Sequence, residues 1–438
     1  MTLWIALMFL TLIIMLILGY PVAFTLGAVA LLYGSIFLGV DFFNLLPLQI
    51  WGVMTNFTLL AVPLFILMGI ILDKSGLAED LLETMALLFG RIRGGLAISV
   101  VLVGALLAAT SGVVGATVVT MGVIALPTML KRNYSPQLAS GTIAAAGTLG
   151  QIVPPSIILI LLGDVIGVPV GRLFIGAVIP GVLLISLFLV YISVYCWIKP
   201  EVGPALTKIE GDDGLIRKII FTLFPPLLLV IGVLGSIFFG VASPTESAAI
   251  GAIGAMLLAA VHKRLSLRNL QDAMQQTTRL TSMVFLILIG ATAFGLVFRG
   301  MGGASLVSEL MLSLPGGTWG FLAASMALIF ALGFFLDFLQ ICFIVVPILQ
   351  PIAIQLNIDL LWLAVLIGIN LQTSFLTPPF GFSLFYLKAV APPSINIQHI
   401  YKGILPFVLI QIIVIVILLV FPETVLWLPN LMDEWQGL

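Results

Sequence analysis

The sequence GTLGQIVPPS at residues 147–156 places two adjacent prolines inside a long apolar segment. A second stretch, LQTSFLTPPF at 371–380, carries its own proline pair 224 positions later. Proline lacks a backbone N–H and its ring clashes with the preceding helical turn, so each pair is expected to break a helix and leave carbonyls without intrahelical partners. The polar side chains beside the breaks are those of Thr148, Gln151, Thr373, Ser374 and Thr377.

The composition is that of a polytopic membrane protein. Of 438 residues, 61% are hydrophobic and only 8% are charged, whereas soluble domains carry about 25% charged residues. The first apolar run resembles a signal peptide, but it has no basic n-region and leads directly into another run, so we interpret it as a retained helix. A net charge of −1 without a basic cluster argues against a nucleic-acid partner. The runs long enough to cross most of a hydrocarbon core cover 3–19, 22–39, 57–72, 175–198, 219–240, 243–261, 280–298 and 403–421.

The two halves of the chain resemble each other. A polar linker at 199–218 divides the chain, and the short motif VPPS in the first half is matched by TPPF in the second at an offset of 224. We expect repeats at 1–205 and 206–438. Each contains apolar spans, a hairpin and a proline-broken helix. The hairpins are predicted at 95–130 and 318–356, and the broken helices at 136–167 and 359–390.

The predicted hairpins are expected to be re-entrant. Their lengths fall short of two full crossings plus a turn, and the centre of the first, TSGVVG, is too apolar for an aqueous loop. Each half then has an odd number of crossings, so the repeats are predicted to be inverted. Of the 17 Lys and Arg residues, this topology leaves only Arg172 and Arg299 outside, which fits the positive-inside rule. Both termini are therefore expected on the outside, in an all-α fold of two inverted repeats.

One carboxylate lies deep in the second hairpin, in GFFLDFLQICF at 333–343. An ionised Asp at the centre of a lipid-embedded helix costs roughly 2.5–3.5 kcal/mol. The offset of 224 places Asp337 at the tip of its hairpin, near the polar atoms of the second break. Inverted repeats with broken helices are typical of secondary transporters, whose sites form near the midplane. Carbonyl and hydroxyl oxygens suit a small hard cation, and a cation at this tip would keep Asp337 ionised.

Several polar residues also have a structural interpretation. Each proline pair alone is consistent with a helix kink satisfied by Ser and Thr side chains. SPTE at 243–246 is predicted to be a capping box. Asp164 is interpreted as interfacial. Arg299 fits an interfacial anchor as well as it fits an anionic substrate or a docking protein.

Long motifs throughout the chain resemble the large membrane subunit of tripartite ATP-independent periplasmic (TRAP) transporters. The resemblance implies an elevator-type fold, like that of the ion-transporter superfamily, and sodium-coupled import of a carboxylate-containing solute across the bacterial inner membrane. It also implies a separate small four-helix membrane subunit and a periplasmic substrate-binding protein. The motifs are PLFILMGIILDKSGLAEDLL (63–82), AATSGVVGATVVTMGVIALPTM (108–129), YSPQLASGTIAAAGTLGQIVPPS (134–156), ASPTESAAIGA (242–252) and TPPFGFSLFYLK (377–388).

The same resemblance implies two sodium sites. Around one cation it places Ser111, Gly112, Thr148 and Pro154. Around the other it places Asp337, Thr373, Ser374 and Thr377. The solute stays open between a C4-dicarboxylate, a sugar acid such as sialic acid, and a keto acid.

Three other functions were weighed. An intramembrane aspartyl protease would need a second deep aspartate, and Asp164 near a span end is a poor candidate. A proton-coupled transporter is a nearer alternative, because a raised Asp337 pKa would make this residue a proton carrier. A channel is disfavoured, since hairpins at two matched depths suit alternating access better than a continuous pore.

Overall fold

A computed structural model describes residues 2–112, 114–205, 215–379 and 381–436, and every regular element in these ranges is helical. Seven helices are long and apolar enough to cross a membrane, or eight if one bent pair counts as a span, within the described ranges. The all-α, multi-pass prediction is therefore confirmed. The linker residues 206–214 lie outside the described part of the chain.

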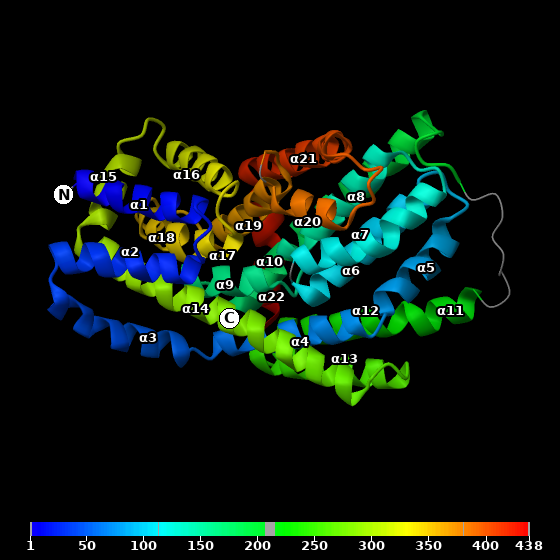
Figure 1. Cartoon of the computed structure of the whole chain (residues 1–438), viewed down its shortest axis with the longest axis horizontal. Helices are drawn as coiled ribbons and strands as arrows, with labels where there is room; N and C mark the ends of the chain where they lie inside the picture. Colours follow the sequence, from blue (N-terminus) through cyan, green and yellow to red (C-terminus); the bar gives the residue numbers. More distant parts are fainter. Residues whose placement is uncertain (1, 113, 206–214, 380, 437–438) are drawn as a thin grey trace.

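One group of helices, called here the frame helices, combines the first part of each half of the chain. Within it, α2 packs along α14 and α4 packs along α13, so each half contributes one helix to each pair. In Figure 1 these elements follow one another along the lower part of the molecule. The frame elements are α1 (Thr2–Ile17), α2 (Val22–Phe37), η1 (Val40–Leu45), α3 (Leu46–Met54), η2 (Thr58–Leu60), α4 (Ala61–Lys74), α11 (Leu215–Thr222), α12 (Phe224–Phe238), α13 (Pro244–Val261) and α14 (Leu267–Gly300).

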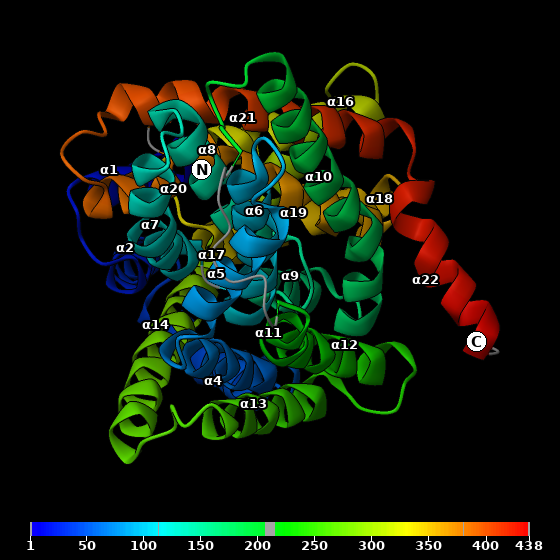
Figure 2. The ribbon, with the colours of Figure 1, turned by 90° about the vertical axis from the view of Figure 1, so that its right-hand side faces the viewer.

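A second group, called the core helices, contains both hairpins and both broken helices. The broken helices are its most buried part, since every residue of 361–376 and of 138–152 is buried. The long helices α10 and α21 pack against the broken helices. In Figure 2, α8, α9 and α19 lie between α4 and α13 at the bottom and α21 at the top. The core elements are α6 (Gly95–Ser111), α7 (Val114–Lys131), α8 (Pro136–Thr148), η3 (Leu149–Gln151), α9 (Ile157–Ile166), α10 (Val170–Ile198), α16 (Thr318–Leu332), α17 (Phe338–Gln340), the π-helix η4 (Ile341–Val345), α18 (Val346–Gln355), α19 (Leu360–Leu376), α20 (Phe382–Val390) and α21 (Ile397–Val420).

Short helices α5 (Leu77–Phe89) and α15 (Gly303–Leu312) connect frame and core in the two halves. The predicted hairpins are two pairs of helices, α6–α7 and α16–α18, and the predicted broken helices are α8–α9 and α19–α20. Helices α7 and α17 begin at Val114 and Phe338, 224 positions apart, and α8 and α19 begin at Pro136 and Leu360 with the same offset. The matching helix order supports a repeat, whereas its exact boundaries, its inversion and the re-entrance of the hairpins stay predictions.

Two elements differ from the expectation for the sequence. The third span of the first half is a bent pair, in which η1–α3 and η2–α4 meet at 57°, whereas its counterpart α14 runs unbroken for 34 residues. At the bend, the Thr55 hydroxyl donates back to the Trp51 carbonyl, and Asn56 follows outside the helix. The residues after the last apolar run, 403–421, form a further helix, α22 (Glu423–Gln436), which packs on α10, and Arg172 forms an ion pair with Asp433 at 2.7 Å.

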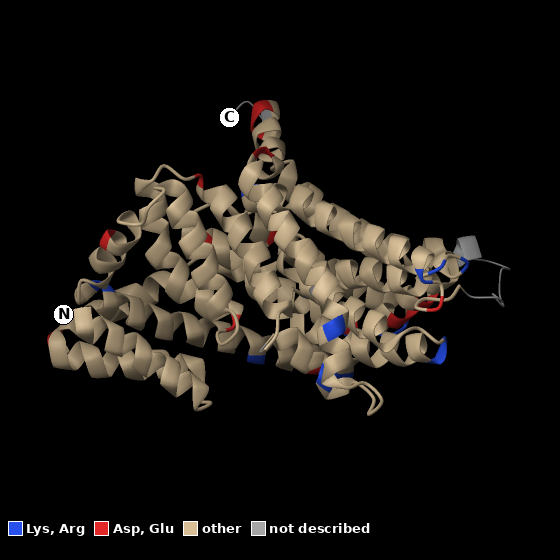
Figure 3. Ribbon diagram, turned by 90° about the horizontal axis from the view of Figure 1, so that it is seen from above, with Lys and Arg blue, Asp and Glu red and all other residues tan. Residues whose placement is uncertain are grey.

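The basic side chains are unevenly distributed over the structure. Figure 3 shows most Lys and Arg residues in the right-hand part of the view and few near the N-terminus at the left. This distribution agrees with a positive-inside arrangement. Which end faces the cytoplasm stays a prediction.

The contact between α8 and α21 depends on two glycines. A Cβ on Gly403 would lie 2.1 Å from the Gln137 carbonyl oxygen, and one on Gly141 would lie 2.2 Å from the Gly403 carbonyl oxygen. Backbone atoms at this distance cannot move aside cheaply, and forced overpacking typically costs about 1–3 kcal/mol. Only glycine therefore allows the two helices to approach this closely.

We predict that Gly403→Ala lowers the melting temperature of the detergent-solubilised protein. Gly232→Ala in α12 is the matched control, because a Cβ there meets no atom within 4 Å and alanine favours a helix by about 1 kcal/mol over glycine. The control should melt at the same temperature as the original protein or higher. Equal melting of both variants would contradict the close packing of α8 on α21.

Candidate functional site

The first helix break is enclosed by the arms of the first hairpin. A Cβ on Gly150 would lie 2.8 Å from the Ala108 carbonyl oxygen in α6, and one on Gly147 would lie 2.2 Å from Val118 Cγ2 in α7. Because Gly147 and Gly150 have no side chain, both arms of the hairpin can approach the backbone of the broken helix. The turn between η3 and α9 is thereby held against the end of the hairpin.

The residues predicted for the first cation gather around this turn. Gly112 ends α6 with φ +60°, and a Cβ there would lie 2.7 Å from Ile157, just past Pro154. Thr148 is fully buried at the last position of α8, and its hydroxyl donates to the Ala145 carbonyl at 2.8 Å. Ser111 is the last residue of α6; its side chain lies outside the described part of the structure.

Asp337 lies between α16 and α17, at the place predicted to be the tip of the second hairpin. It is half-buried and caps the N-terminus of α17, where its Oδ1 accepts a hydrogen bond from the Phe338 N–H at 2.7 Å. The same tip lies against the second break, because a Cβ on Gly333 would lie 2.1 Å from the Ser374 hydroxyl oxygen. The carboxylate is therefore on the short segment that meets α19.

Three hydroxyls predicted for the second cation lie on the last turns of α19. Thr373 donates to the Ile369 carbonyl at 2.8 Å, Ser374 to the Leu371 carbonyl at 2.8 Å, and Thr377 to the Thr373 carbonyl at 2.6 Å. A hydroxyl that donates its hydrogen keeps its oxygen lone pairs available as acceptors. These oxygens can therefore bind a cation while their hydrogens remain hydrogen-bonded to backbone carbonyls of α19.

The chemistry of the two breaks suits a hard monovalent cation. Among the described residues, no three His, Cys, Asp or Glu side chains lie close enough to form a metal cluster. The oxygens at the breaks belong instead to backbone carbonyls, hydroxyls and one carboxylate, which are ligands for hard cations. The side-chain amides of Gln151 and Gln372 are also buried without hydrogen-bond partners in the described part of the chain. The residues present thus fit a sodium ion.

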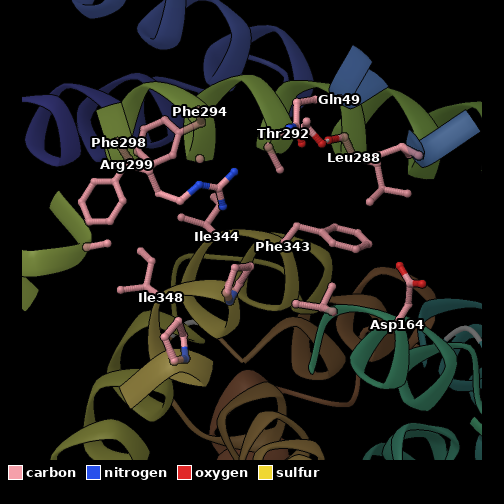
Figure 4. A pocket seen from close by; sticks show the side chains of 17 residues that line it. Gln49, Asp164, Leu288, Thr292, Phe294, Phe298, Arg299, Phe343, Ile344 and Ile348 are labelled. Carbon is pink, nitrogen blue, oxygen red and sulfur yellow. Dashed lines mark hydrogen bonds between the residues drawn. The ribbon is translucent and has the colours of Figure 1, made fainter. Parts of the chain in front are cut away.

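A separate pocket of about 260 Å³ lies between frame and core. Arg299 projects into it from α14, and Asp164 lies at the other end on α9, as Figure 4 shows. Both residues stand out in the sequence, but nothing in the sequence indicates that they lie together. The remaining lining residues carry no distinct signal in the sequence because they lie in largely apolar runs in which Gln49 and Thr292 are isolated polar residues. They are Gln49, Val53, Val165, Leu288, Ala291, Thr292, Phe294, Gly295, Phe298, Ala304, Phe343, Ile344, Pro347, Ile348 and Pro351.

The SPTE motif and Asp164 have different surroundings in the structure. The capping box at 243–246 is confirmed: Ser243 accepts from the Glu246 N–H at 3.3 Å, and Glu246 accepts from the Ser243 N–H at 2.7 Å. Asp164, by contrast, lines the pocket, and its Oδ1 accepts a hydrogen bond from Asn56 Nδ2 at 2.5 Å. It therefore belongs to the wall of a cavity between frame and core.

Comparison with known proteins identifies the family. The model of "Tripartite ATP-independent periplasmic transporter, DctM component" matches residues 9–424. The chain belongs to this family. It is 32% identical to the C4-dicarboxylate TRAP transporter large permease protein DctM of Pseudomonas aeruginosa, with 90% of each chain covered. It is 30% identical to the sialic acid TRAP transporter large permease protein SiaM of Vibrio cholerae, with 94% of this chain and 95% of that one covered.

A solved structure shares the fold of this TRAP permease. The YdaH transporter of Alcanivorax borkumensis, described as having an unusual topology, superposes with a TM-score of 0.64 over 98% of both chains. The sequence identity is 14%, so the likeness concerns the fold. The predicted membership in the TRAP large-subunit family is thus confirmed by the sequence comparisons, and the solved structure shares the all-helical fold.

The contact of Gly333 with Ser374 generates a prediction about stability. Gly333→Ala should lower the melting temperature, because the new Cβ would overlap the Ser374 side chain and overpacking costs about 1–3 kcal/mol. Adding Ser374→Gly removes the overlapping atoms, so the double variant should recover most of the loss in thermal unfolding assays. A double variant less stable than Gly333→Ala would contradict the predicted overlap.

Proposed function

We propose that this TRAP large permease subunit is a sodium-driven importer of a carboxylate-containing solute. The observation that carries the proposal is Asp337, held at a hairpin tip beside a helix break whose hydroxyl oxygens are free to accept. Solutes in the names of two relatives, C4-dicarboxylates and sialic acid, both contain carboxylates. Arg299 in the pocket supplies a cation that can bind this group.

Movement of the core helices past the frame helices would carry the solute across the membrane. Support for this elevator mechanism comes from the packing of both breaks and both hairpins into one group, and from the position of the pocket at its boundary with α3 and α14. The pocket wall is mostly apolar, so relative movement breaks few hydrogen bonds. The function is accordingly transport, with no chemical conversion of the solute.

The protein would work with two partners. We infer a separate small four-helix membrane subunit and a periplasmic binding protein that delivers the solute, as family membership implies. Large apolar side chains are exposed on α1, α2, α12 and α21; they would contact lipid or the small subunit. The proposed location is the bacterial inner membrane, with both termini in the periplasm.

Sodium coupling is tested by Asp337→Asn. At about 4 Å and an effective dielectric near 20, a carboxylate attracts a cation by on the order of 4 kcal/mol. Losing part of this attraction should raise the sodium concentration for half-maximal uptake at least ~10-fold. The measurement is solute uptake by proteoliposomes that contain the permease, its small subunit and the loaded binding protein.

Asp359→Asn is the matched control for this experiment. Asp359 caps α19 through the Trp362 N–H at 3.0 Å, and asparagine caps a helix about as well as aspartate. The control should therefore keep its sodium dependence. Uptake that is driven by a proton gradient in sodium-free medium and abolished by Asp337→Asn would contradict sodium coupling. It would indicate that the transporter is coupled to protons. Robust uptake by the permease alone would contradict the need for partners.

The orientation is tested with single cysteines at exposed positions. Glu201→Cys lies in the linker after α10, and Glu434→Cys lies in α22. An impermeant thiol reagent added to intact spheroplasts should label Glu434→Cys and should reach Glu201→Cys only after lysis. The reverse pattern would invert the proposed topology. The native Cys196 and Cys342 are buried, so they give a low background.

A further inference from the structure

The pocket between frame and core has opposite charges at its two ends. Arg299 lies at the end of α14, where a helix C-terminus favours a cation. Asp164 lies two residues before the end of α9, and a helix C-terminus disfavours a carboxylate. Local helix electrostatics therefore explain the arginine but not the aspartate, which calls for another reason for a negative charge in this wall.

Asn56 fixes the Asp164 carboxylate from the opposite side of the boundary. Its Nδ2 donates to Asp164 Oδ1 at 2.5 Å, while its own Oδ1 accepts from the Thr58 N–H at 2.9 Å. Among the described residues, Asn56 is the hydrogen-bonding partner of this carboxylate. Asp164 Oδ2 is therefore available to a molecule in the pocket, and Figure 4 shows the carboxylate directed toward the space below α14.

The rest of the lining defines what fits between the two charges. Phe294, Phe298 and Phe343 supply apolar walls, and Gln49 and Thr292 supply neutral polar groups. A volume of about 260 Å³ is below the roughly 300–1,000 Å³ of pockets for drug-sized ligands. The pocket thus suits a small solute whose carboxylate meets Arg299 and whose other end donates hydrogen bonds.

We propose that Asp164 is a specificity-determining residue that selects a monocarboxylate with hydrogen-bond donors at its far end and rejects a dicarboxylate. Hydroxyl or ammonium hydrogens of the solute donate to Asp164, while a second carboxylate there meets a like charge. The inference rests on the proposed transport function, and within that function it favours a hydroxylated acid over a C4-dicarboxylate.

The test measures binding by the full-length permease in lipid nanodiscs with three probes: gluconate, 6-aminohexanoate and succinate. The permease should bind gluconate or 6-aminohexanoate in preference to succinate. Asp164→Asn keeps an oxygen for Asn56 and removes the charge, so the preference should fall roughly 10- to 100-fold, the range for a hydrogen bond to a charged group. A ratio of two affinities within one protein does not change when part of the sample is unfolded.

Two further variants separate the possible outcomes. Arg299→Gln should weaken the binding of all three probes. Asp359→Asn, which lies outside the pocket, should leave the preference among the probes unchanged. A preference for 6-aminohexanoate over gluconate that disappears in Asp164→Asn supports the proposal with ammonium as the donor. Equal binding of succinate and gluconate, an unchanged preference in Asp164→Asn, or no binding of any probe would overturn it. Sodium-dependent uptake that Asp337→Asn impairs would still support the transport function in each of those cases.

Discussion

The constraint on which this structure depends is that a helix broken inside an apolar environment must satisfy its backbone within the protein, since lipid offers no hydrogen-bond partners. The proline pairs at 154–155 and 378–379 create two such breaks, the first buried and the second partly exposed. Hydroxyls of neighbouring residues take up some freed carbonyls, as Ser156 does for Gln151 and Ser383 for Phe375. The first hairpin packs against the first turn, where Pro154 and Pro155 are buried, whereas Pro379 in the second turn is exposed.

Enclosing the breaks brings the functional groups together. The hairpin arms reach the broken helices only because glycines such as Gly150 and Gly333 leave space for a neighbouring backbone or side chain. The same hairpin carries Asp337, and the ring of the next residue, Phe338, lies 6.3 Å from the ring of Phe375 near the end of α19. Tight packing and a polar cluster are therefore two results of one arrangement, and a change that loosens the hairpin also separates the oxygens that suit a cation.

A proline pair is a local signal for a helix break, and the helices α8 and α19 both end shortly before such a pair; the inverted repeat and the re-entrant hairpins stay predictions. The bend between α3 and α4 has only a weak sequence signal, since residues 45–54 are largely apolar and the break depends on Thr55 and Asn56. The pocket was missed for a different reason. Gln49, Asp164 and Arg299 are far apart in the chain, and only the packing of α3, α9 and α14 makes them neighbours of one cavity.

The hydrogen bond from Asn56 to Asp164 connects the frame helices with the core helices. It joins the bend between α3 and α4 to α9, the core helix that follows the first break. The bend is therefore linked to the pocket that Asp164 lines. If the core helices move past the frame, this bond must break, and a solute that donates to the same carboxylate can replace it. A second carboxylate at that position cannot, because an ionised carboxylate has no hydrogen to donate at pH 7. Release of the core and selection of the solute would then depend on one aspartate.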